Sequence, residues 1–177
     1  MSNLTGTYNL DPAHSSIGFT VRHAMVTKVR GEFTDFDATV TIAEDPAASS
    51  ASGTVRTASV ETRNADRDAH VRGEDFFAVE QYPEMTFTAT SFDVDAQGNG
   101  TVTGDLTIKE TTKPITFDVE TFGVEEDPFG NTRIGFEART TINRSEYGID
   151  FQAPLNSGGM LVSEKVGIEI EGSAIKQ

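Results

Sequence analysis

The amino-acid sequence predicts a single all-β domain, built from one antiparallel sheet that closes into a barrel. Two observations support this fold class: polar and apolar residues alternate with a period of two, and turn residues separate the alternating runs at regular intervals. Between Thr101 and Lys109, the even positions hold Val, Gly, Leu and Ile, and the odd positions hold polar residues. Strands with one apolar and one polar face are typical of antiparallel sheets. The 177 residues suit one domain, and no linker or internal repeat divides them.

Eight or nine strands follow from these runs. They cover residues 6–10, 15–23, 29–42, 52–61, 84–94, 100–109, 113–125, 131–143 and 163–175, and the first is either separate from the second or continuous with it. Turns such as Asp127–Asn131 divide neighbouring strands. The parity of the apolar residues slips between Phe33 and Phe36 and again between Phe87 and Phe92, so a β-bulge is expected at each place.

Three segments interrupt the strand pattern. Residues 64–79 are polar, charged and poor in β-branched side chains, which favours one or two short helices. Residues 143–148 look like a single turn after a strand, and residues 47–53 form a loop of small residues.

A barrel is favoured over a two-layer sandwich because closure removes the exposed edges of a large sheet, although periodicity alone does not separate the two. Large and small residues share the expected inward face. The large ones are Phe19, Phe87, Leu106, Phe117 and Phe136, and the small ones are Ala89, Gly104, Ala138, Gly172 and Ala174. The small residues either leave room for a ligand or interlock with the large ones in a filled core. Both interpretations stay open at this point.

Composition excludes several classes of function. The net charge is −14, which disfavours binding to nucleic acids or to anionic membranes and keeps a monomer or homodimer soluble. The chain has no cysteine, so disulfides and thiol catalysis are excluded. The N-terminal residues do not resemble a signal peptide, and no apolar run approaches the roughly 18 residues of a membrane span. We therefore expect a cytoplasmic protein without membrane insertion.

The three histidines are the first candidates for chemistry. His14 is expected to form a hydrogen bond within its own turn. His23 shares the inward parity of Phe19 and Val21, so it either meets a ligand at the barrel mouth or bonds to the adjoining loop. His70 is a ligand contact or part of a charged surface. The histidines lack the spacing of a known metal motif, and no nucleophile motif accompanies them, so no metal, cofactor or catalytic residue is expected.

Arginines gather near the predicted helical segment. Arg63, Arg67 and Arg72 lie within it, and Arg144 follows a strand. Such arginines usually pair with carboxylates, here Asp66, Asp68 and Asp75. The alternative is a cationic rim that binds a phosphate or a phenol-like head group.

Six segments together resemble motifs of the YceI-like family, in the family's order and over nearly the whole chain. They are Asp11–His23 (D-x-x-H-S-x-x-x-F-x-V-x-H), Val29–Phe33 (V-x-G-x-F), Arg67–Phe77 (R-D-x-H-L-x-x-x-D-F-F), Tyr82–Phe87 (Y-P-x-I-x-F), Gly104–Ile108 (G-x-L-T-I) and Asn143–Gly148 (N-R-x-D-F-G). Each motif is weak alone, but together they are specific. The chain departs from the family in having Tyr8 where a tryptophan is usual, and its first residues do not resemble the signal peptide that many members carry.

The resemblance implies a lipocalin-like, extended eight-stranded antiparallel barrel with short helices near one end, whose apolar pore binds a polyisoprenoid, an isoprenoid quinone or another long-chain lipid. Carriage, storage or sequestration of that lipid is the leading hypothesis. The expected pore residues are Phe19, Val21, Phe33, Phe87, Leu106, Phe117 and Phe136, and the expected head-group rim is His23, Arg67, His70 and Arg144. The alternatives are an enzyme that uses His23 or His70 as acid–base on a lipid head group, and a filled-barrel, stress-linked interaction module.

Overall fold

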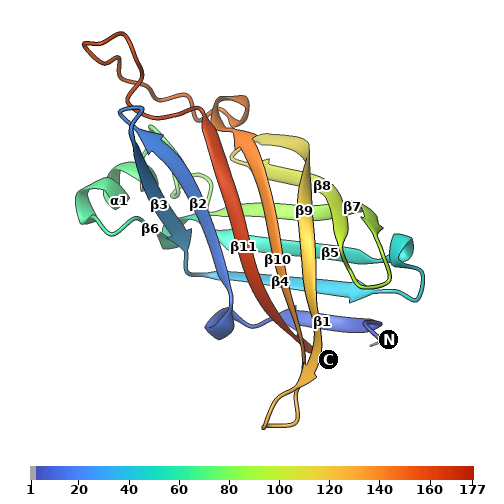
Figure 1. The fold of residues 1–177 in the computed structure, drawn as a ribbon. Helices are drawn as coiled ribbons and strands as arrows, with labels where there is room; N and C mark the ends of the chain where they lie inside the picture. The colour runs from blue at the N-terminus through green and yellow to red at the C-terminus, as the bar shows by residue number, and fades with distance from the viewer. Residues whose placement is uncertain (1–2) are drawn as a thin grey trace.

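The first strand, β1 (Gly6–Leu10), pairs with the last strand, β11 (Lys165–Lys176), and this pairing closes the antiparallel sheet into a barrel. The computed structural model describes residues 3–177 (Figure 1). The other strands are β2 (Ser16–His23), β3 (Thr27–Phe33), β4 (Phe36–Ile42), β5 (Ser50–Arg56), β6 (Val60–Glu61), β7 (Glu84–Val94), β8 (Gly100–Ile108), β9 (Thr111–Glu126) and β10 (Thr132–Asn143).

Eight strands form the closed ring, in the order β1-β4-β5-β7-β8-β9-β10-β11 and back to β1. The remaining strands extend the wall on one side. β11 pairs with β1 through residues 174–176 and with β2 through residues 167–171, and β3 and then β6 follow β2. The predicted eight-stranded extended barrel is therefore confirmed, and the sandwich alternative is wrong.

The helices are short. They are α1 (Ala65–Arg72) and the 3-10 turns η1 (Pro12–His14), η2 (Pro46–Ala48), η3 (Thr57–Ser59) and η4 (Arg144–Tyr147). Asn64 caps α1 by accepting a hydrogen bond from the backbone N–H of Arg67 at 2.9 Å, and Gly73 ends the helix. The predictions of a helix within residues 64–79 and of a turn at 143–148 are confirmed. None of the helices within residues 3–177 has the length and apolar character of a membrane span.

Two predicted strands divide where the parity slips or the chain turns. The predicted strand 29–42 is two strands, because the chain turns a corner at Thr34 and Asp35 between β3 and β4. The corner, rather than a bulge, lets Phe33 and Phe36 both face inward, and both are buried. The predicted strand 52–61 likewise breaks at η3, and the predicted loop 47–53 is shorter than expected, since β5 begins at Ser50.

The second parity slip is a true bulge. The register between β7 and β8 shifts between Ala89 and Ser91, which restores Phe87 and Phe92 to the same face of the sheet. A further shift lies between β9 and β10 at Gly135 and Phe136. Bulges of this kind increase the local twist and help the sheet to curl.

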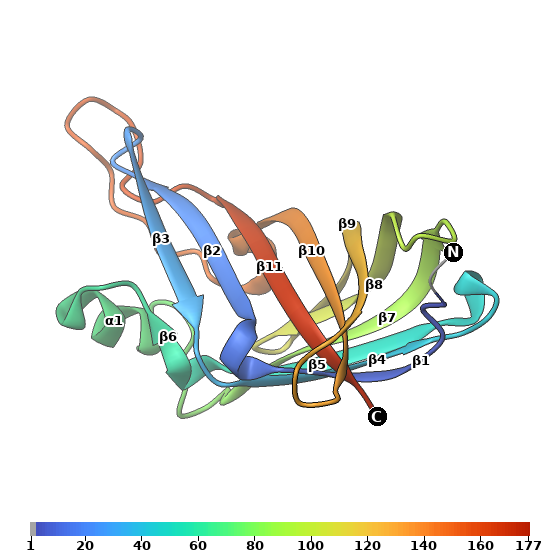
Figure 2. The same ribbon diagram turned by 60° about the horizontal axis from the view of Figure 1, so that its bottom comes forward.

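The two ends of the barrel differ. At one end lie α1, η4, the β2–β3 hairpin and the segment before β11, and the last two project together beyond the ring (Figures 1 and 2). At the other end lie the chain termini, the β7–β8 hairpin and the β9–β10 hairpin. We call these the mouth end and the terminal end.

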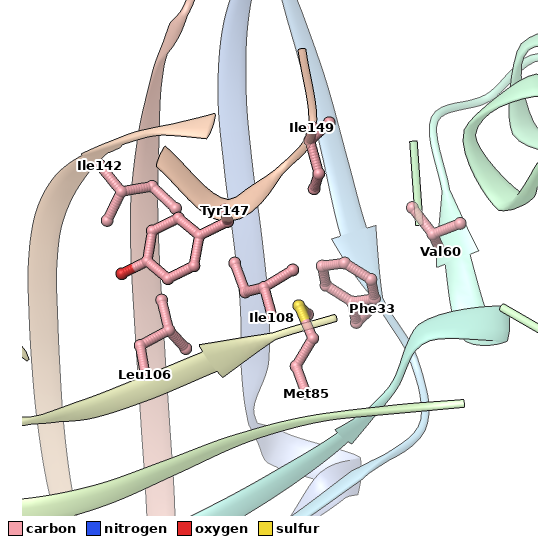
Figure 3. Packing of buried hydrophobic residues seen from close by; sticks show 8 residues of the cluster. All are labelled: Phe33, Val60, Met85, Leu106, Ile108, Ile142, Tyr147 and Ile149. Atoms are coloured by element: carbon pink, nitrogen blue, oxygen red, sulfur yellow. The ribbon is translucent and has the colours of Figure 1, made fainter. Parts of the chain in front are cut away.

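The buried apolar residues form two clusters rather than one central core. The larger cluster lies near α1 and consists of Phe33, Val60, Met85, Leu106, Ile108, Ile142, Tyr147 and Ile149 (Figure 3). The smaller one lies at the terminal end and consists of Leu4, Tyr8, Ile134 and Ala174. Many other inward residues, such as Phe87 and Ile170, are only half-buried. Side chains that face inward without being buried border an internal space.

Candidate functional site: the apolar cavity and its mouth

An apolar cavity of about 880 Å³ occupies the barrel. Its lining runs from His23 and His70 at the mouth end to Leu4 and Gly98 at the terminal end. The volume is near the upper limit for sites that bind small molecules. The barrel is therefore hollow, and the cavity is elongated along the barrel.

The cavity exists because aromatic rings lie flat on glycines of neighbouring strands. A β-carbon at Gly31 would collide with the ring of Phe19, one at Gly104 with the ring of Phe87, and one at Gly172 with the ring of Phe136. The large and small residues interlock, as in the second of the two interpretations of the inward face. They interlock within the wall, however, so the rings do not fill the centre of the barrel.

All eleven predicted site residues border this cavity. The pore set is Phe19, Val21, Phe33, Phe87, Leu106, Phe117 and Phe136, and the rim set is His23, Arg67, His70 and Arg144. The structure thus brings together, at one cavity, residues that the sequence spreads over more than 120 positions. The four residues of the rim set have different environments.

Arg67 lies on α1 and turns back toward Thr62. Its Nε donates to Oγ1 of Thr62 at 2.8 Å, and its Nη2 donates to the carbonyl of Thr62. Asp68 accepts hydrogen bonds from the backbone N–H and the hydroxyl of Thr62. Nη1 of Arg67 takes part in no hydrogen bond within residues 3–177, so this edge of the guanidinium is available at the cavity mouth.

The predicted ion pairs between the helix arginines and Asp66, Asp68 or Asp75 are wrong for the chain as described. Arg72 donates to the carbonyls of Ala58 and Val60, at 3.0 and 3.2 Å. The reason is that β6 pairs with β3 through two residues only, which leaves nearby carbonyls without strand partners. The arginines of α1 satisfy these carbonyls and so attach the helix to the barrel.

His70 is held by an acidic and an aromatic neighbourhood. Its Nε2 lies 2.8 Å from Oδ2 of Asp75, and its ring meets the rings of Phe76 and Phe151 edge-on, with centroids 5.1 and 5.0 Å away. The imidazole is about half-exposed. Its orientation at the mouth is thereby fixed by one hydrogen bond and two ring contacts.

His23 lies at the end of β2, in a projecting structure that we call the mouth lobe. The mouth lobe consists of residues 23–27, the tip of the β2–β3 hairpin, and residues 151–163. The backbone N–H of Ala24 donates to the carbonyl of Leu161 at 2.7 Å, and that of Ser163 donates to the carbonyl of Arg22 at 2.9 Å. These bonds join the two parts of the mouth lobe into one unit.

Arg144 anchors the mouth lobe from below. Its Nε, Nη1 and Nη2 donate to the carbonyls of Ser163, Ile149 and Val162, at 2.9, 2.8 and 3.2 Å. The side chain is buried, and burial lowers the pKa of its guanidinium, although the nearby charges of Glu164 and Asp150 oppose that effect. Arg144 borders the cavity as predicted, but all three of its nitrogens are already engaged with backbone carbonyls.

His14 lies at the terminal end, away from the other two histidines. Its Nδ1 is 2.8 Å from Oδ2 of Asp11, so it makes the hydrogen bond within its own turn that was expected. Residues 3–177 contain no group of His, Asp or Glu arranged to hold a metal ion.

The aromatic part of the mouth was not predicted from the sequence. Phe76, Phe77 and Phe151 border the cavity, and Phe76 lies 5.3 Å from Phe151 between ring centroids. The pair Phe76–Phe77 was a visible signal, because two adjacent phenylalanines stand in an otherwise charged segment. Phe151 carried no such signal, since its position depends on the path of the chain after η4.

Comparison with known proteins agrees with this geometry. The "UPF0312 protein SERP2314" of Staphylococcus epidermidis is 38% identical over 164 residues, which cover 92% of this chain and 93% of that protein. The crystal structure of BcnA from Burkholderia cenocepacia matches with a TM-score of 0.77 at 26% identity, over 93% of this chain and 98% of that one. A polyisoprenoid binding domain from Saccharophagus degradans shares the fold, with a TM-score of 0.71 at 15% identity, over 96% of this chain and 98% of that one.

The sequence also matches the YceI-like domain over residues 8–174, which is nearly the whole chain. That extent, together with a relative 38% identical over 92% of the chain, confirms the resemblance first drawn from six short motifs. This chain belongs to the YceI-like family.

Proposed function

We propose that this protein binds one long-chain lipid, of the polyisoprenoid or isoprenoid quinone type, inside its barrel, for carriage, storage or sequestration. The observation that carries the proposal is the elongated apolar cavity of about 880 Å³. A chain inside it leaves water along most of its length, which contributes about 0.8 kcal/mol for each methylene group. About ten such groups would give some 8 kcal/mol before the cost of association, so binding needs no catalytic group.

The mouth supports an amphiphilic rather than a purely apolar ligand. The free Nη1 edge of Arg67 and the imidazoles of His23 and His70 are polar groups at the mouth of a predominantly apolar cavity. A lipid head group with an oxygen acceptor, such as a phosphate, a quinone or a phenol, would meet these groups while its tail lies deeper. The Saccharophagus degradans domain that shares this fold is named a polyisoprenoid binding domain, which supports a lipid as the ligand.

A substitution inside the barrel tests the proposal directly. Ala138 faces the cavity, and Ala138→Phe would add a ring to its interior, whereas Thr141→Phe adds the same ring to the outer face of the same strand. Exclusion of even two methylene groups weakens binding about tenfold. We expect native mass spectrometry of the purified protein to show a bound lipid for the wild type and T141F, and at least a tenfold smaller lipid signal for A138F.

The outcome against the proposal is equally clear. A wild-type protein that carries no lipid from cells and takes up neither an added polyprenol nor an added menaquinone would contradict it. Equal occupancy in A138F and T141F would place the ligand outside the barrel. The filled-barrel alternative already conflicts with the cavity, because a filled barrel has no internal space of this size.

One arrangement favours a second candidate function, acid–base catalysis on a lipid head group. The 2.8 Å contact between His70 and Asp75 orients an imidazole at the mouth, as a carboxylate does for a catalytic histidine. His70→Ala and His23→Ala separate the two functions. If the protein only binds lipid, the lipid stays chemically unchanged in the wild type and in both variants. If it is an enzyme, the wild type converts the bound lipid, and the variants bind the lipid without converting it.

A further inference from the structure

We infer that the mouth lobe is a docking surface for a lipid bilayer with anionic head groups. The inference goes beyond ligand binding in the barrel. It rests on the proposed function in one respect only, namely that lipid exchange would be the purpose of docking. It follows from three features of the described residues: an exposed apolar tip, the cations Arg22 and Lys28 that flank this tip, and the position of this surface beside the cavity mouth.

The tip exposes large apolar side chains. Met25, Val26 and Met160 have exposed fractions of 64%, 76% and 52%, and all three lie in the mouth lobe. Exposed side chains of this kind are usually scattered singly, whereas here they come from two segments that are joined by backbone hydrogen bonds. The projection of these two segments beyond the barrel is visible in Figures 1 and 2.

The backbone keeps this tip in an unusual conformation. Ala24 and Met25 have φ angles of 50° and 67°, which place two residues with side chains in the left-handed region at a hairpin turn that favours Asn and Gly. Gly159 accommodates the result, because a β-carbon there would collide with the side chain of Met25. The apolar tip is therefore maintained against local strain, which is common where strain serves a binding site.

The charge of this region contrasts with that of the whole chain. The protein has a net charge of −14, but residues 12–31 contain Arg22, Lys28 and Arg30 and no acidic residue, and residues 151–163 contain no charged residue at all. Arg22 and Lys28 flank the lobe and share one outer groove with Met25 and Met160. Away from the lobe, the groove continues over β9, β10 and β11, where its charged residues are Arg139, Lys165, Asp118, Glu164 and Glu169. The cations and the apolar tip thus form one continuous surface, which complements an anionic lipid interface.

The mouth of the cavity adjoins the same surface. His23, Phe151 and Val162 belong to the mouth lobe and also line the cavity. A lipid that leaves a bilayer at this surface would enter the barrel without crossing bulk water. The acidic remainder of the protein would be repelled from the same anionic bilayer, so only this orientation is favourable.

Co-sedimentation with vesicles tests the inference, and it needs no ligand in the barrel. The probes are vesicles of equal parts phosphatidylcholine and phosphatidylglycerol, and vesicles of phosphatidylcholine alone. We expect the wild type to bind the mixed vesicles more tightly. The variant M25S/V26S/M160S should bind them at least about tenfold more weakly, and R22Q/K28Q about fivefold more weakly for each lost charge.

Phe129 supplies the matched control. It is 88% exposed at the tip of the β9–β10 hairpin, at the terminal end of the barrel, so F129S removes a large exposed apolar side chain at the opposite end and should leave vesicle binding unchanged. Circular dichroism checks that each variant is folded. R22Q/K28Q alters exposed side chains only and provides a second, independent variant should the triple substitution unfold the lobe.

Several results would overturn the inference. They are a wild type that stays in the supernatant with mixed vesicles, a triple variant that binds as tightly as the wild type, and an F129S variant that binds as weakly as the triple variant. A dimer in sedimentation velocity that M25S/V26S/M160S abolishes would assign the surface to a second copy instead. Mass spectrometry of the bound lipid is a separate readout, so vesicle binding without any lipid in the barrel would contradict the proposed function and support docking.

Discussion

Tyr8 and Tyr147 are almost completely buried, with exposed fractions of 0% and 1%, but their hydroxyl groups have different surroundings. Oη of Tyr8 donates to the carbonyl of Leu4 at 2.9 Å, whereas Oη of Tyr147 has no partner within residues 3–177. Burial raises the pKa of both phenols. Both therefore stay neutral near pH 7, and they differ only in hydrogen bonding.

This difference gives a prediction with opposite signs for one chemical change. Tyr147→Phe removes a buried hydroxyl that makes no hydrogen bond, so the free energy of unfolding should rise by about 1 kcal/mol. Tyr8→Phe removes the hydrogen-bond partner of a buried carbonyl, so the free energy of unfolding should fall by about 1 kcal/mol. Urea unfolding of the two variants checks this, and a loss of stability in Y147F would show that the hydroxyl has a partner in solution.

Arg144 shows how far a single residue can be interpreted from sequence. Its motif and its place after a strand indicated an arginine at the mouth, and it is there. Its hydrogen bonds to the carbonyls of Ile149, Val162 and Ser163 could not be predicted, because they depend on the path of the loop that follows η4. The sequence indicated the position of the charge but not its role as an anchor of the mouth lobe.

At the scale of strands, alternation was informative where one face is apolar throughout. The predicted strands at 100–109 and 131–143 agree with β8 and β10 to within one residue at each end. Where two apolar residues of opposite parity are both inward, as at Phe33 and Phe36, the same signal fits either a bulge or a corner. The structure has the corner, and only contacts distant in sequence, such as that of β3 with β6, decide between the two.

A cluster of charged residues lies where the barrel closes. Nη1 of Arg133 lies 2.8 Å from the carboxylate of Asp11, and its Nε lies 2.7 Å from that of Asp127. The same Oδ2 of Asp11 lies 2.8 Å from Nδ1 of His14. The backbone N–H of Asp11 donates to the carbonyl of Ser173 at 2.8 Å. Ser173 lies where β11 changes its partner from β2 to β1, so the cluster holds the seam of the ring.

This cluster should make stability depend on pH in acid. The hydrogen bond from Arg133 is the main cause that lowers the pKa of Asp11 and of Asp127 from 3.8 to about 2. Because the folded-state pKa is depressed, the stabilisation is fully present above about pH 4 and is lost as the pH falls toward 2. Unfolding should then take up at most two protons in this range, one for each carboxylate.

Arg133→Gln tests the assignment, because it removes the charge that holds both carboxylates ionised. We expect the loss of stability between pH 4 and pH 2 to become shallower in R133Q, with lower stability than the wild type at neutral pH. Urea unfolding as a function of pH measures both effects. Arg139→Gln is the control, since Arg139 is exposed and its ion pairs lie outside the seam. An unchanged pH profile in R133Q would exclude the cluster as the source of acid sensitivity.

At the scale of the whole molecule, net charge proved a poor guide to local charge. The value of −14 predicts repulsion from anionic membranes, and it describes most of the surface. The mouth lobe is the exception, because its two segments, residues 23–27 and 151–163, contain no acidic side chain and meet only in the folded protein. A patch assembled from two distant segments is invisible to a sum over the chain.

The cavity was also beyond the reach of sequence pattern. Parity showed that large and small residues share the inward face, but not whether they interlock across the barrel or within its wall. The decisive fact is register: Phe19 lies opposite Gly31 on the adjacent strand, and Phe136 lies opposite Gly172. Only the pairing of strands shows that these rings cover glycines and leave the centre free.

A hollow barrel should gain stability when it is filled. Inward residues such as Phe87 and Ile170 are only half-buried in the structure, so a bound lipid would complete their burial. A ligand at a hundredfold excess over its dissociation constant stabilises the folded state by about 2.7 kcal/mol. For a domain of this length, that corresponds to a rise in Tm of roughly 8 °C. Calorimetry of delipidated protein with and without an added menaquinone measures the rise. A138F should show little of it and T141F all of it, whereas equal rises in both variants would mean that the lipid stabilises the protein from outside the barrel.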